Sequence, residues 1–225
     1  MFELSGEAWA GLLGGLGGAI VGGLISWLLQ LQARASDRAA QAESRRERQT
    51  AMAHAIIYKL MAIASHYAVY TRKFEGDWAK HGGEAEPWQF VLGSAHEPDP
   101  VHFTTDEMTL LVELGMEDVF NSLLTLAEAH NQMGCVSALY ARKREELRQS
   151  LPPAAFVDGR LVTKADAVLA ARPLMIELNT LATSMRDFAS RDARESLATL
   201  ETAHAGFADK LGIKWKLVDP PTREA

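Results

Sequence analysis

The sequence contains only one cysteine among its 225 residues, Cys135, so the chain cannot form an internal disulfide bond. The neighbours of this cysteine are apolar or small, and no second thiol accompanies it, which predicts a buried structural thiol. Basic residues are not in excess, because 23 Lys and Arg residues stand against 29 Asp and Glu residues. This balance argues against a nucleic-acid partner.

Motifs of familiar catalytic chemistry are also missing. The sequence has no Gly-x-Ser-x-Gly, no Walker loop and no Cys-x-x-Cys, and its glycine run does not follow a strand as a dinucleotide fingerprint would. We therefore expect no catalytic residues, no cofactor and no enzymatic activity.

One Glu-x-x-His motif, formed by Glu201 and His204, has the spacing used in di-iron helical bundles. Such a site needs a second Glu-x-x-His and two further carboxylates, and no other histidine has a glutamate three residues before it. Glu201 and His204 are thus weak metal candidates, and a packed histidine is the favoured interpretation. The same interpretation applies to His54, His66 and His130, which lie on or beside apolar helical stripes.

Charge is absent from the 26 positions between Glu7 and Arg34. An apolar run of this length predicts a transmembrane helix over residues 8–31, after a short outer tail at 1–7. Trp9 and Trp27 lie about 27 Å apart on such a helix, where they would anchor it at the two membrane interfaces. A cleaved signal peptide is less well supported, because the first residues are acidic and the apolar run is too long.

Five arginines follow the predicted span, whereas no Lys or Arg precedes it: Arg34, Arg38, Arg45, Arg46 and Arg48. The positive-inside rule then places the carboxyl-terminal part in the cytoplasm and the amino terminus outside, at the inner membrane of a bacterial cell. The same arginines would either bind anionic lipid headgroups or serve only to set the topology.

Glycines crowd one side of the predicted span. On a helix with 100° per residue, five of them share an arc of about 100°: Gly11, Gly14, Gly15, Gly18 and Gly22. A face without side chains lets a second helix approach closely, so this glycine zipper predicts a homo-oligomer formed through the span.

The remainder predicts an all-α fold. Residues 32–50 read as a polar, Arg-rich helical neck, and residues 51–212 as a cytoplasmic antiparallel bundle of three to four long helices with coiled-coil-like apolar stripes. A loop at about 80–103 and irregular structure at 151–162, with a turn at Asp158-Gly159, interrupt the bundle. Thr104 and Glu107 have the spacing of a capping box, while Gly115 and Gly212 are expected to end helices. In the tail, 213–225, Trp215 would either dock on the bundle or present itself to a partner or to the membrane face.

The stretches F-T-T-D-E-M-T-L-L-V-E-L-G and F-N-S-L-L-T-L-A-E-A-H-N follow the span and its Arg-rich neck. With them the chain resembles a set of bacterial single-pass membrane proteins with cytoplasmic helical domains, a resemblance that carries no activity.

The function expected from these features is that of a membrane-anchored, oligomeric interaction scaffold or sensor with a cytoplasmic protein partner. A pore assembled from the glycine-rich spans is the alternative, although Ser26 is the only clearly polar side chain there, and a lumen of this kind would be dry. A metal-binding helical bundle is the second alternative.

Overall fold

The structure, a computed structural model, describes residues 6–81, 83, 85–92, 98–151, 155–157, 160–162 and 165–215. Within residues 6–35 the described side chains are those of Trp27, Gln30, Gln32 and Arg34. The chain divides into two compact units, 1–50 and 51–225. Helix α1 (Gly6–His81) belongs to both, and the other helices and strands belong to the second unit.

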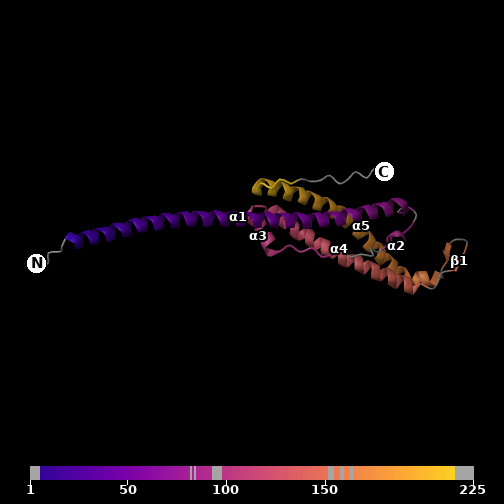
Figure 1. Ribbon diagram of the computed structural model, residues 1–225. Helices are drawn as coiled ribbons and strands as arrows, with labels where there is room; N and C mark the ends of the chain where they lie inside the picture. The colour runs from indigo at the N-terminus through magenta and orange to yellow at the C-terminus, as the bar shows by residue number, and fades with distance from the viewer. Residues whose placement is uncertain are drawn as a thin grey trace. The chain divides into compact units, whose positions relative to one another are not determined.

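The second unit is a helical bundle, which confirms the all-α prediction at this level (Figure 1). Its long helices are the carboxyl-terminal part of α1, α4 (Glu117–Ser150) and α5 (Ala165–Leu211). Two short helices, α2 (Pro87–Phe90) and α3 (Thr105–Glu113), lie between α1 and α4 in the sequence. The predicted loop at 80–103 is therefore wrong for residues 87–90, which form a helical turn beginning with a proline.

Strands β1 (Ala155–Val157) and β2 (Arg160–Val162) connect α4 to α5 as an antiparallel pair, in which Val157 is opposite Arg160. The prediction of irregular structure there is wrong for these residues, while Asp158 and Gly159 lie outside the described residues.

Two of the three long helices run in the same direction, so the prediction of an antiparallel bundle is wrong in this respect. His66 of α1 contacts His130 of α4, and the residues that follow α1 reach Tyr140, further along α4. Helix α5 runs the other way, because Tyr67 of α1 lies beside Asp192, whereas Glu75, further along α1, pairs with the earlier Arg186. The cause is the connection before α3, which carries the chain back along the bundle before α4 begins.

The expected helix ends follow from local sequence chemistry. The Thr104 side chain accepts a hydrogen bond from the Glu107 backbone N–H, and the Glu107 carboxylate accepts one from the Thr104 N–H, which confirms the capping box. Gly115, with a φ of 65°, separates α3 from α4, and Gly212, with a φ of 67°, follows the last residue of α5. Both glycines adopt the left-handed conformation that other residues rarely reach.

Glu107 also ties α3 to α1. Its carboxylate is 5% exposed and lies 2.7 Å from the ammonium group of Lys59, which donates a further hydrogen bond to the carbonyl of His102. A buried carboxylate that loses its cation is left with an uncompensated charge. This ion pair therefore holds the amino end of α3 against α1.

The Lys59→Met substitution tests this coupling. It should lower the free energy of unfolding by about 3 kcal/mol, because the buried Glu107 carboxylate would lose its partner. Urea unfolding of the full chain, followed by circular dichroism, measures the change.

Arg148→Met is the matched control, because Arg148 pairs with Glu145 on the exposed surface of α4. Exposed pairs contribute little, so this variant should unfold nearly as the parent does. Equal losses in the two variants would contradict the proposed coupling.

Candidate functional site

A layer of polar side chains divides the core of the bundle. One hydrophobic cluster ends at Leu60, Leu126 and Ala203, and the other begins at Ile63, Met133 and Ala193. The polar residues at this level come from all three long helices, and we call them the polar layer: the partly exposed His66 and the buried His130, Asp192, Ser196 and Thr199.

The two histidines form the contact between α1 and α4 within this layer. Their rings are stacked, and the Nδ1 atom of His66 lies 2.9 Å from the Nε2 atom of His130. His130 is 2% exposed, whereas His66 is partly exposed. A hydrogen bond of this length requires one proton between the two nitrogens, so the protonation states of the rings depend on each other.

The side chain of Asn131 bears on which ring nitrogen of His130 carries the proton. Its side-chain oxygen accepts from the Val101 N–H and its NH₂ group donates to the Val101 carbonyl, which fixes the orientation of the amide. The same oxygen lies 3.4 Å from His130 Nδ1, and this contact favours the tautomer in which Nδ1 carries the ring proton. In that tautomer, His130 Nε2 accepts the hydrogen bond that His66 Nδ1 donates.

Near α5, a tyrosine of α1 adjoins the polar layer, and Asp192 of the layer forms an ion pair. Burial and the neighbouring Asp192 carboxylate raise the pKa of the Tyr67 phenol, so it stays protonated. Asp192 is buried and accepts a hydrogen bond of 2.7 Å from Nε of Arg191, whose guanidinium lies over the Phe188 ring. A cavity of about 110 Å³ adjoins Asp192, which is room for a few water molecules.

The wider cavities lie at the surface. One of about 440 Å³ is lined by Phe103, Leu124 and Cys135, and one of about 380 Å³ by Trp88, Arg144 and Arg148. Cys135 is exposed, so the prediction of a buried thiol is wrong. The reason is helix register, since Met133, Gly134 and Ser137 face the core and Cys135 points away from it.

The carboxyl-terminal end brings together two other histidines. Beyond Gly212 the chain packs Trp215 against the edge of the His54 ring, at 4.7 Å between centroids, and against His204, at 5.5 Å. Trp215 is expected from the sequence either to dock on the bundle or to present itself outward, and in the structure it docks. His204 thus serves packing, while Glu201 is exposed. Within the described part of the chain, no three His, Cys, Asp or Glu side chains gather as a metal site would require.

The predicted membrane-facing residues belong to α1. The side chains of Arg34, Arg38, Arg45, Arg46 and Arg48 are exposed, and the Trp27 ring is 57% exposed. Trp9 lies outside the described side chains, as does the face expected for Gly11, Gly14, Gly15, Gly18 and Gly22. No helix among the residues that the structure describes is both long and apolar enough to cross a membrane.

The chain was compared with protein-family models, with curated proteins and with solved structures, and none of them matches it.

Sequence reasoning did not identify the polar layer as a unit. His66 and His130 are 64 residues apart, and each looks like an isolated polar residue on an apolar stripe. A signal was present, because each of these histidines interrupts a helical stripe that would otherwise be apolar. The pairing itself depends on the parallel arrangement of α1 and α4, which those stripes do not specify.

The polar layer should make the bundle sensitive to acid. Burial lowers the pKa of His130 below its ordinary value of 6.5. The unfolded chain therefore binds more protons below that pH, and the free energy of unfolding falls as the pH falls. One such histidine gives a slope of up to about 1.4 kcal/mol per pH unit, measured by urea unfolding between about pH 7 and pH 5.

The His130→Asn variant should show a smaller slope over this interval. His81→Asn is its control, since His81 is exposed at the end of α1 and its removal should leave the slope unchanged. If His130→Asn keeps the full slope, His130 is not the group that responds to acid.

Proposed function

We propose that this chain is a membrane-anchored helical-bundle protein that self-associates through its amino-terminal span. It serves as an interaction scaffold or sensor and has no enzymatic activity. The amino terminus lies outside and the bundle in the cytoplasm, at the inner membrane of a bacterial cell.

The observation that carries this proposal is the continuity of α1. One helix of 76 residues, Gly6–His81, contains the uncharged run and ends as a member of the bundle. No turn or glycine-rich linker separates the two units along this helix. A helix is a stiff connection, so an event in the bundle and the state of the anchor are coupled more directly than through a flexible linker.

The neck is consistent with a position between a membrane and a folded unit. Side chains from residue 36 to residue 48 are exposed on all sides of α1. Arg34 and the exposed arginines of this segment would lie near the headgroups of the inner leaflet. Each contributes about 1 kcal/mol to the attraction of anionic lipid.

The bundle supports interaction rather than catalysis. His130 and the Tyr67 phenol are buried, and the pKa shifts of both favour the neutral form. Large apolar side chains are instead exposed on all three long helices, where they are available to a protein partner: Tyr58, Met61, Val69, Leu124, Leu169, Ile176, Phe188 and Leu197.

The orientation can be tested with reporters fused after Ala225. A reporter that works only in the cytoplasm should be active, and one that works only in the periplasm should be inactive, because the arginines follow the span. The opposite pattern would show that the bundle lies on the other side.

Self-association through the span is tested by replacing Gly14, Gly18 and Gly22 together by Leu. This triple variant should still insert but should lose its signal in a membrane two-hybrid assay, because leucine side chains keep the helices apart.

Replacing Leu13, Leu16 and Ile20 by Val is the matched control and should leave the signal nearly intact. Similar behaviour of the two triple variants would mean that the glycine face is not the contact.

A further inference from the structure

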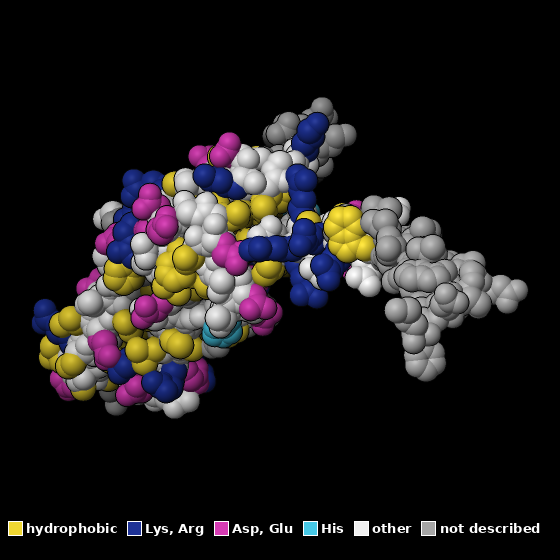
Figure 2. All heavy atoms as spheres, turned by 90° about the vertical axis from the view of Figure 1, so that its left-hand side faces the viewer, with side chains coloured by type: hydrophobic (Ala, Val, Ile, Leu, Met, Phe, Trp, Pro, Cys, Tyr) yellow, Lys and Arg dark blue, Asp and Glu magenta, His cyan; other side chains and the backbone are white. Residues whose placement is uncertain are grey.

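One stretch of α1 in the bundle, residues 49–71, has a single charged residue. Between Arg48 and Arg72 the sequence contains no Asp, Glu or Arg, and Lys59 is its only lysine. Elsewhere the surface of the bundle mixes both signs of charge, as the space-filling view shows (Figure 2). A helix of more than six turns with one charge is unusual for a chain in which 23% of residues are charged.

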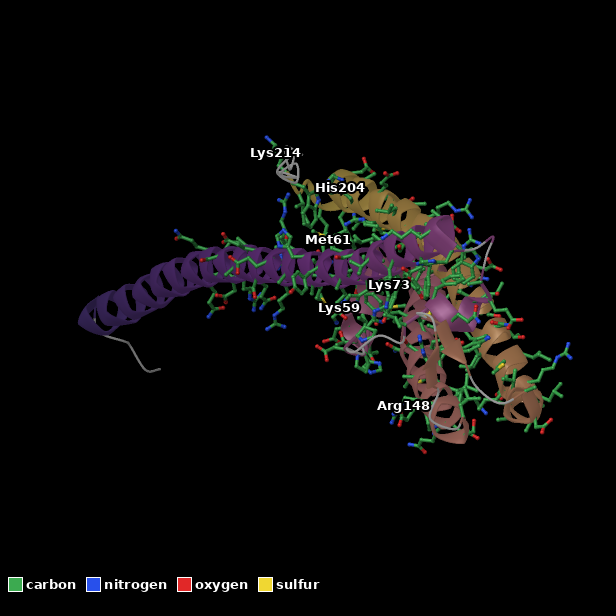
Figure 3. All side chains as sticks on the ribbon, turned by 90° about the vertical axis from the view of Figure 1, so that its right-hand side faces the viewer. Lys59, Met61, Lys73, Arg148, His204 and Lys214 are labelled. Carbon is green, nitrogen blue, oxygen red and sulfur yellow. The ribbon has the colours of Figure 1, made fainter. Side chains whose placement is uncertain are left out.

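The one charged side chain of this segment and one of its two histidines are turned toward the bundle. Lys59 pairs with Glu107, and His66 bonds to His130. Lys59 and Met61 leave α1 on opposite sides (Figure 3). The outward side is thus left without charge, and we call its residues the neutral face: Tyr58, Met61, Ala62, Ser65, Ala68 and Val69.

The neutral face is open to solvent in the single chain. Tyr58 is 75% exposed, Val69 58% and Met61 47%. Tyr and Met are enriched at the centres of protein interfaces, where charged residues are depleted. Ser65 and Ala68 are small and exposed, so a second helix can approach closely between the larger side chains.

A second copy of this chain fits the face better than a charged partner does. In a symmetric pair of parallel helices each residue lies close to its own counterpart, so any charge would face the same charge. A stripe without charge avoids this repulsion, so the same stripe on two copies can pack together. The single cation of the segment is withdrawn from the stripe, because Lys59 is bound to Glu107.

The anchor supplies the second argument for a copy of the same chain. This step rests on the proposed function, in which the spans associate. Tethering two copies through one interface raises the effective concentration of their other surfaces to the millimolar range, so a small apolar face suffices. We infer that the neutral face of α1 contacts the neutral face of a second copy of this chain, with the two α1 helices parallel.

Disulfide cross-linking in membranes tests this inference on the full chain. In a Cys135→Ser background, S65C places one thiol on the neutral face, and T125C places one at an exposed position of α4 as the control. The S65C chain should form disulfide-linked dimers at least roughly tenfold faster than the T125C chain, because only its thiols are held together.

A pair of matched valine variants adds a second measurement. Val69 and Val112 are similarly exposed, at 58% and 53%, but only Val69 belongs to the neutral face. V69E in the S65C background should slow cross-linking roughly tenfold, since like charges would meet, whereas V112E should leave it unchanged.

The possible outcomes separate this inference from the proposed function. If the spans associate in the two-hybrid assay but the S65C and T125C chains cross-link equally, the neutral face is not the contact and the proposed function stands. If S65C cross-links only to a different protein, the face serves another partner and the inference is overturned. If neither assay detects self-association, both the inference and the proposed oligomer fail.

Discussion

The ion pair between Lys59 and Glu107 is the interaction on which the rest of the bundle depends. Glu107 caps α3 through Thr104 and binds Lys59, the one charged residue of α1 between Arg48 and Arg72. It thereby fixes where α3 begins, next to the early part of the bundle segment of α1. Helix α4 follows α3 directly after Gly115. It therefore also begins beside the early part of the bundle segment of α1 and runs parallel to α1.

The polar layer is a second constraint, and it acts on register. A bundle held only by apolar stripes can slide by one turn at a small cost, whereas a buried hydrogen bond between specific side chains is lost on sliding. The His66–His130 contact fixes α1 against α4, and Asp192 of α5 lies beside Tyr67 of α1. Buried polar contacts of this kind favour one arrangement of helices over its neighbours more than they add stability.

Local signals in the sequence predict much of this fold. The capping box at Thr104 and the ends at Gly115 and Gly212 depend on neighbouring residues alone, and the structure has them as expected. The direction of α4 was not predictable in the same way, because it depends on Lys59 finding a carboxylate 48 residues away. The exposure of Cys135 shows a related limit, since apolar neighbours in sequence do not tell which side of the helix faces the core.

We propose that the chain works as a self-associated assembly anchored in a membrane. The neutral face of α1 and the glycine face expected in the span would then serve one assembly, joined by a single helix. The most direct measurement is native mass spectrometry of the full chain released from lipid nanodiscs. We expect two or more copies of the chain in each released particle, with lipid bound. Single copies released from the nanodiscs, or a chain that never enters them, would contradict it.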